Sequence, residues 1–186
     1  MAHHTEKPPM LPSDEATEKE LDMAREQGNV LGKALDHMLT EVADDGQEKL
    51  VEHYLIGYAI EKAEGMYMPD ENGELVWHEP EEENIHVEVS VRDAADGRFI
   101  PNLTIHARLI DSENNIVGMH LQPFVWHPWV YHYGRNWVIE KEGAYTLEVE
   151  IKAPDFHRHD KKNGKRYPKD VSTSFSPVNI SLDEEK

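Results

Sequence analysis

Residues 85–91 constrain the fold more than any other stretch of this sequence. Apolar and polar residues alternate strictly along it, and the apolar ones are Ile85, Val87, Val89 and Val91. A period of two predicts a β-strand with one face in a core, because successive side chains point to opposite sides of a strand. His86 and Glu88 share the other face, where both can reach one metal ion. Taken alone, this pair is more typical of a solvated polar face.

Similar short alternating segments recur from residue 50 onward. Turn signals such as Asn72-Gly73, Asp96-Gly97 and Asn114-Asn115 separate them. Roughly seven short strands with a turn about every ten residues are typical of a β-sandwich. We therefore expect one all-β domain over residues 49–182, followed by a short tail at 183–186.

Residues 1–48 have a different character and form an N-terminal extension. Residues 1–12 are polar and rich in proline, which predicts a disordered tail. Ser13 and the acidic residues after it are typical of a helix start, and apolar residues between Val30 and Val42 follow helical spacing. We predict a helix within residues 14–45 that Gly28 and Gly32 weaken or divide, packed on the domain or on a partner.

Composition excludes several classes of function. A formal net charge of −18 argues against nucleic acid, whose phosphates a partner must neutralise. The absence of cysteine excludes disulfides, thiolate metal sites and a cysteine nucleophile. No apolar run approaches the ~20 residues of a membrane span, so we expect a protein that does not span the membrane. The first ten residues do not read as a signal peptide, which leaves a cytoplasmic location open.

Residues 118–137 suit a binding site better than an ordinary strand. Three histidines and three of the four tryptophans of the chain lie within them, together with two prolines. The histidines are His120, His127 and His132. Imidazoles bind metal ions, aromatic rings exclude water, and prolines hold an irregular backbone. The simpler alternative is an aromatic core loop with exposed histidines.

Four segments, in order, resemble the periplasmic iron-transport proteins, which are small copper- and iron-linked proteins encoded beside an iron permease. The first two are Ile85-His86-Val87-Glu88 and the stretch from Ile100 to Ile105. The others are His132-Tyr133-Gly134-Arg135-Asn136 and Arg158-His159-Asp160. The resemblance spans about residues 50–182 and leaves the N-terminal extension outside.

The resemblance implies an immunoglobulin-like β-sandwich that dimerises and lies in the periplasm. It also implies a metal site built from His86, His132 and His159, with Glu88 as an auxiliary carboxylate. The methionine ligand of the family has no clear counterpart in this sequence. Gln122 or His120 can fill its position, and Met119 can if the register slips by one residue.

These observations favour a metal-binding accessory to iron uptake by a membrane permease, rather than an enzyme. An imidazole-rich site favours copper as Cu2+, with iron or zinc as alternatives. Two other hypotheses stay open. One is a redox metalloenzyme with an open copper centre, and the other is a structural or interaction β-sandwich whose histidines only make hydrogen bonds.

Overall fold

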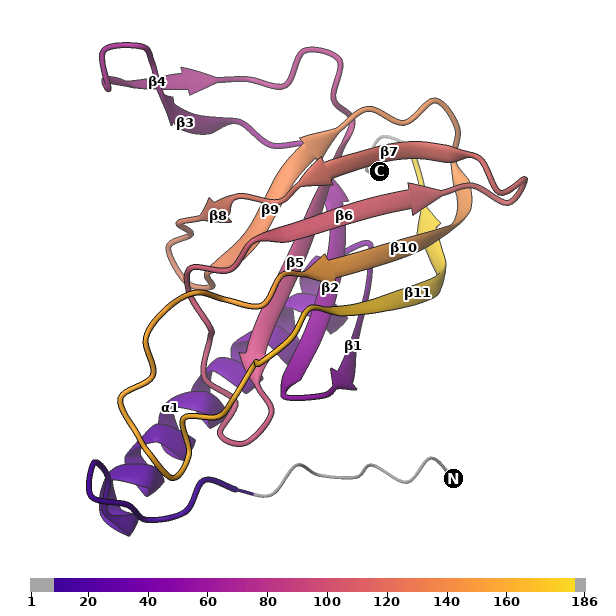
Figure 1. Ribbon diagram of the computed structural model, residues 1–186. Coiled ribbons are helices and arrows are strands. Elements are labelled where there is room, and N and C mark those ends of the chain that lie inside the picture. Colours follow the sequence, from indigo (N-terminus) through magenta and orange to yellow (C-terminus); the bar gives the residue numbers. More distant parts are fainter. Residues whose placement is uncertain (1–8, 183–186) are drawn as a thin grey trace.

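The computed structural model describes residues 9–182, so the predicted tail at 183–186 and the first eight residues of the predicted N-terminal tail lie outside them. Two antiparallel sheets form a sandwich (Figure 1), which confirms the predicted all-β, immunoglobulin-like class. The five-stranded sheet has the order β1 (Asp45–Val51), β2 (Tyr54–Lys62), β5 (Ile85–Asp93), β9 (His132–Trp137) and β8 (Phe124–Val125). The four-stranded sheet has the order β11 (Val171–Ile180), β10 (Gly143–Ile151), β6 (Ile105–Ile110) and β7 (Ile116–Leu121). A separate hairpin of β3 (Met66–Pro69) and β4 (Leu75–His78) projects from the sandwich.

The main hydrophobic core fills the space between the two sheets. All four apolar residues of the segment 85–91 are buried there, as their alternation predicts. Leu109, Leu147 and Phe175 meet them from the four-stranded sheet and are fully buried. Because one face of β5 is committed to this core, His86 and Glu88 must point to the opposite face of the five-stranded sheet, which we call its outer face.

The N-terminal extension is helical, as predicted, but the glycines do not divide it. Helix α1 (Glu18–His37) begins with a capping box between Thr17 and Glu20 and continues directly into a π-helical turn, η1 (Met38–Val42). A Cβ at Gly28 would lie 1.7 Å from the backbone oxygen of Asp96. Gly28 therefore permits a close approach of the helix to the sandwich, and this packing offsets its poor helix propensity.

Helix α1 and η1 pack against the outer face of the five-stranded sheet. Leu35 and Met38 form a second buried cluster with Ala59 of β2 and Val130. Figure 1 shows the helix behind this sheet, so the molecule has three layers, with the five-stranded sheet in the middle. Neither helix within residues 9–182 has the length and apolar character that a membrane span requires.

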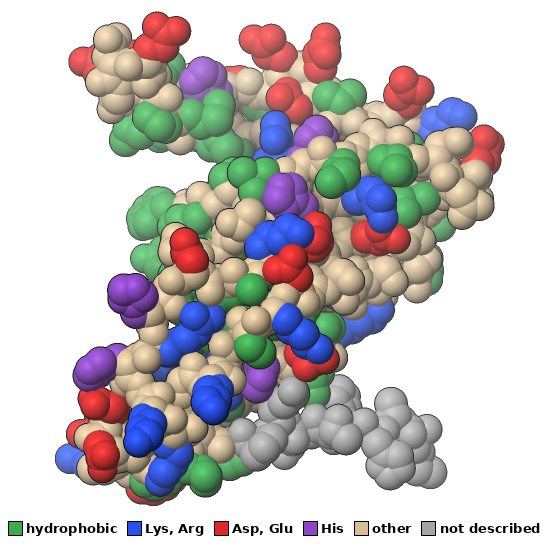
Figure 2. Space-filling model, in the orientation of Figure 1, with side chains coloured by type: hydrophobic (Ala, Val, Ile, Leu, Met, Phe, Trp, Pro, Cys, Tyr) green, Lys and Arg blue, Asp and Glu red, His purple; other side chains and the backbone are tan. Residues whose placement is uncertain are grey.

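Between β10 and β11 the chain makes a long excursion, residues 152–170, which we call the late loop. Arg166 and Tyr167 anchor it to the sandwich through the buried carboxylate of Asp93. The Tyr167 ring also stacks on Tyr54, with ring centroids 4.9 Å apart. The late loop carries much of the positive charge on the face drawn in Figure 2, where Lys and Arg side chains gather towards its lower end.

Candidate metal centre

Strands β5 and β9 bring His86, Glu88 and His132 together on the outer face of the five-stranded sheet. The strands pair so that His86 lies opposite Asn136 and Glu88 lies opposite Gly134. The three side chains are buried, with exposed fractions of 2% for each histidine and 6% for Glu88. Buried imidazoles beside a buried carboxylate form a set of donors that can hold a metal ion.

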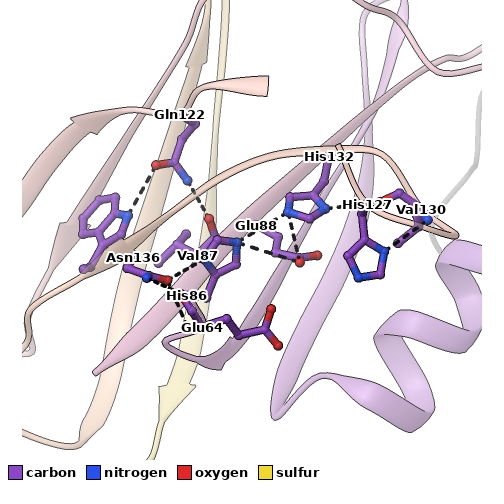
Figure 3. A network of polar contacts seen from close by, with 10 residues as sticks. Glu64, His86, Val87, Glu88, Gln122, His127, Val130, His132 and Asn136 are labelled. Atoms are coloured by element: carbon purple, nitrogen blue, oxygen red, sulfur yellow. Dashed lines mark hydrogen bonds and ion pairs between the residues drawn. The ribbon is translucent and has the colours of Figure 1, made fainter. Parts of the chain in front are cut away.

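The distances within this cluster fit a single ion (Figure 3). The Nε2 atoms of His86 and His132 lie 3.4 Å apart. Glu88 Oε1 lies 3.3 Å from the Nε2 of His132 and 3.9 Å from that of His86. A point in the plane of these three atoms and equidistant from them lies about 2.1 Å from each, the usual length of a bond from zinc or a similar metal to imidazole or carboxylate.

Hydrogen bonds at the far side of each ring direct both Nε2 atoms towards the centre. Asn136 Oδ1 lies 2.8 Å from His86 Nδ1, and the Asn136 amide donates to the carbonyl of Glu64 at 2.7 Å. This second bond fixes the orientation of the amide, so Asn136 Oδ1 accepts a hydrogen bond from the Nδ1–H group of His86. His132 Nδ1 lies 3.4 Å from the carbonyl of Val130, which can only accept. Both Nε2 lone pairs are therefore free for a metal ion.

Burial controls the charge state of the cluster. It raises the pKa of Glu88 to about 8, and the negative charges of Glu61 and Glu64 add to this effect. Burial also lowers the pKa of His132 to about 3, with a further contribution from His86. The pKa of His86 is lowered for the same main reason. Without metal at neutral pH, the cluster holds neutral imidazoles and a protonated carboxyl, whose proton a cation can replace.

Gly134, in strand β9, makes room for the cluster. A Cβ at Gly134 would lie 2.8 Å from His86 Nε2 and 3.0 Å from His132 Cδ2. The neighbouring Tyr133 points into the core, where its hydroxyl donates to the carbonyl of Ile100 at 2.8 Å and accepts from the amide of Leu103 at 3.1 Å. In the His-Tyr-Gly sequence, the histidine is thus a candidate ligand, the tyrosine anchors the strand in the core, and the glycine leaves space for both imidazoles.

The candidates for the fourth ligand do not lie in this cluster. Gln122 is buried, but its amide donates to the carbonyl of Val87 at 2.8 Å and its Oε1 accepts from Trp137 at 3.3 Å. His120, on the edge strand β7, packs edge-on against Trp137 with centroids 4.5 Å apart. Met119 on the same strand is 58% exposed. Within this chain, Gln122 is therefore engaged in hydrogen bonds and His120 in a ring contact.

His159 also lies apart from His86 and His132. Its side chain is 92% exposed on the late loop, and its Nδ1 lies 3.1 Å from Glu15 Oε2. The loop continues towards the start of the helix, where Ser13 donates to Asp160 at 2.8 Å. The late loop that carries this histidine is thus anchored by Asp93 on one side and by residues 11–15 on the other.

Two residues near the cluster, Asn136 and His127, could not be assigned a role at the metal site from the sequence. Asn136 belongs to the His-Tyr-Gly segment, but only the pairing of β9 with β5 shows that it orients His86. His127 lies with its ring centroid 6.0 Å from that of His132, and its Nδ1 accepts from the amide of Val130 at 3.4 Å. The only feature of the sequence that pointed to His127 was the high density of histidines in residues 118–137.

The fold and the site together define a β-sandwich protein with a buried histidine–carboxylate cluster suited to a metal ion. The sequence matches the family described as Fe2+ transport protein over residues 40–181, so the chain belongs to this family. Helix α1 lies before the matched region. Comparison with curated proteins gives no match.

Solved structures support the same fold. FetP of uropathogenic E. coli strain F11, expressed in the periplasm of E. coli, is 22% identical with a TM-score of 0.57, over 73% of this chain and 95% of that chain. Copper-reconstituted P19 of Campylobacter jejuni is 19% identical with a TM-score of 0.58, over 73% of this chain and 96% of that chain. Both are β-sandwich proteins, as this chain is.

Proposed function

We propose that this protein binds a copper ion at His86, Glu88 and His132 and serves iron uptake by a membrane permease. The observation that carries the proposal is the triangle of two Nε2 atoms and one carboxylate oxygen, whose size fits one ion. Membership of the Fe2+ transport protein family supports the link to iron. The copper-reconstituted state of P19 and the periplasmic expression of FetP support copper and a location outside the cytoplasm.

The donor set favours Cu2+ over the alternatives. Imidazole and carboxylate ligands accept Cu2+, Zn2+ and Fe2+, and among divalent ions of this series Cu2+ binds most tightly to a given site. The metal is the cargo of a binding protein in this proposal, and the protein acts as an accessory rather than as an enzyme. Iron and zinc are the competing cargoes that the experiment below distinguishes.

We further propose that the protein is a homodimer in which His159 completes the site of the other copy. The cluster offers three donors, whereas a closed tetrahedral site takes four. His159 is almost fully exposed and lies apart from the cluster of its own chain. Exposed apolar side chains on the hairpin, including Tyr67, Leu75 and Trp77, supply surface of the kind that association covers.

Metal titration tests the site directly. Protein purified without chelator and without a metal-affinity column should retain copper, and Cu2+ should outcompete Zn2+ and Fe2+. His86→Ala and His132→Ala should each weaken Cu2+ binding by about a hundredfold or more, because each removes one of few ligands. His78→Ala on the exposed strand β4 is the matched control and should bind as the parent does. Equal affinity in all four proteins would refute the assignment.

Mixed dimers test the shared site. Homodimers of His132→Ala lack a cluster ligand, and homodimers of His159→Ala lack the ligand from the other copy. A dimer of one chain of each kind would contain one complete site. An equimolar mixture with random association, in which about half of the dimers are mixed, should therefore restore high-affinity binding at about a quarter of the sites. A mixture that binds no better than either variant would show that His159 does not act across the dimer.

A further inference from the structure

The N-terminal extension covers the same face of the sheet that carries the metal cluster. On this face, Ala59 of β2 lies directly opposite Glu88 of β5. Leu35 and Met38 pack on Ala59 and on Val130, whose carbonyl is the partner of His132 Nδ1. The end of the helix is therefore seated beside two of the three candidate ligands.

A tight contact in the middle of the helix fixes this position. Gly28 is buried against the turn between β5 and β6, where a Cβ would meet the backbone oxygen of Asp96 at 1.7 Å. Gly32, one turn later, has only the end of the Arg92 side chain near it, with Nη1 at 3.1 Å from a Cβ. The two glycines thus have opposite environments within one helix.

The start of the extension is anchored to the late loop. The backbone of Leu11 exchanges two hydrogen bonds with the Asn163 side chain, at 2.9 Å and 2.8 Å. Ser13 donates to Asp160 at 2.8 Å, and Glu15 lies 3.1 Å from His159. The extension is therefore held at three points, the last of which is beside the metal cluster.

We propose that the N-terminal extension is a cover that slows exchange of the bound metal with solvent. The inference rests on the proposed metal site. Helix α1 lies outside the region matched to the family, residues 40–181, so the cover is an addition to the family fold in this chain. His86, Glu88 and His132 are almost inaccessible with the extension in place. A chelator, a hydrated ion or the His159 side chain of another copy needs an opening of several ångströms, and local displacement of the helix end provides it.

The two glycines supply a matched pair of variants. Gly28→Ala and Gly32→Ala raise helix propensity equally, but only the first forces the helix away from the sandwich. Loss of bound Cu2+ to excess chelator, followed by stopped flow, should accelerate about tenfold or more in Gly28→Ala and stay unchanged in Gly32→Ala. Equal rates in both variants and the parent would overturn the proposal.

A second pair covers the case in which Gly28→Ala does not fold. Leu35→Ala removes a contact with Ala59 and Val130, whereas Val30→Ala truncates a side chain that is 66% exposed on the same helix. Only Leu35→Ala should speed metal loss. An equal acceleration in Val30→Ala would mean that helix stability in general, and not the cover, sets the rate.

A measurement without metal separates failure of the cover from failure of the proposed function. Diethyl pyrocarbonate modifies accessible imidazoles, and mass spectrometry locates the modified histidine. In metal-free protein, His132 should react several-fold faster in Leu35→Ala than in Val30→Ala, while the exposed His78 reacts equally in both. If His132 is labelled faster in Leu35→Ala but the protein binds no metal, the extension covers the site and the proposed metal-binding function is wrong. Equal labelling of His132 in Leu35→Ala and Val30→Ala would show that the extension does not cover the site, whether or not the protein binds metal.

Discussion

The Nε2 atoms of His86 and His132 lie 3.4 Å apart, although 46 positions separate the two residues in the chain. Both rings carry their proton on Nδ1, so two lone pairs face each other across this gap. Such a contact is unfavourable unless a hydrogen-bond donor or a cation lies between or beside the lone pairs. The protonated carboxyl of Glu88 can supply it without metal, and a cation can supply it when bound.

Metal affinity should depend on pH through Glu88 rather than through the histidines. Glu88 must lose its proton to bind an ion, and burial raises its pKa to about 8. Because burial lowers the pKa of His132 to about 3, that ring is already neutral at pH 6. Apparent affinity should rise about tenfold per pH unit from pH 6 to 8 and then level off. A Cu2+ titration at five pH values tests this, and a rise confined to the region below pH 6.5 would point to the histidines instead.

The stability of the metal-free protein should fall as pH rises, and Glu88 should be a main cause. Its pKa is about 8 when folded against a usual value of 4.5, so the folded state binds this proton more tightly than the unfolded state. The stabilising contribution is complete below pH 4.5 and is lost as pH rises through about 8. The whole loss is on the order of 5 kcal/mol, and about half of it falls between pH 6 and pH 8.

Glu88→Gln should remove this dependence, because the amide stays neutral at every pH. Urea unfolding at pH 6 and pH 8.5 should show a smaller decrease for Glu88→Gln than for the parent. Glu71→Gln, in the exposed turn between β3 and β4, should decrease as the parent does. Parallel decreases in all three proteins would mean that Glu88 ionises normally in the fold.

Asn136→Ala should weaken metal binding without removing a ligand. The Asn136 side chain accepts from His86 Nδ1 at 2.8 Å and so keeps the Nε2 lone pair directed at the centre. Loss of such a partner typically costs 10- to 100-fold in metal affinity. The ring nitrogens of His86 should also show a mixture of tautomers by 15N NMR. Asn179→Ala, on the exposed side of β11, is the control, and equal affinity in both variants would contradict the role.

Gln122→Ala should affect stability and leave metal binding intact. The side chain satisfies the carbonyl of Val87 and the indole of Trp137, both in the core. Leaving these groups without partners costs about 2 kcal/mol, which a urea titration can measure. If Cu2+ affinity fell by more than tenfold in Gln122→Ala, the amide would be a ligand after all. His120→Ala should change the stability and the Cu2+ affinity only slightly, since that ring packs on the side of Trp137.

The strands could be predicted because their signal is local. The alternation in residues 85–91 predicts which side chains enter the core, and all four of the apolar ones are buried there. The same alternation placed His86 and Glu88 on one face before any neighbour was known. The helical extension was predictable for the same reason, since its apolar spacing lies within one segment, although the N-cap is Thr17 and not Ser13.

Gly28 shows where local reasoning failed. Helix propensity counts glycine as a weakness, and the sequence therefore predicted a helix that its glycines weaken or divide. The structure instead brings a backbone oxygen so close that only glycine fits. Propensity describes an isolated segment, whereas the close approach is a property of two segments in contact.

The sequence by itself determined the sandwich class, the face shared by His86 and Glu88, and the set of histidines worth testing. Only the tertiary structure decided that β9 pairs with β5, which places His132 at the cluster and Asn136 behind His86. It also decided that the extension covers this face and that His159 lies apart. Side-chain alternation is encoded residue by residue, but strand neighbours and register depend on how all the layers pack together.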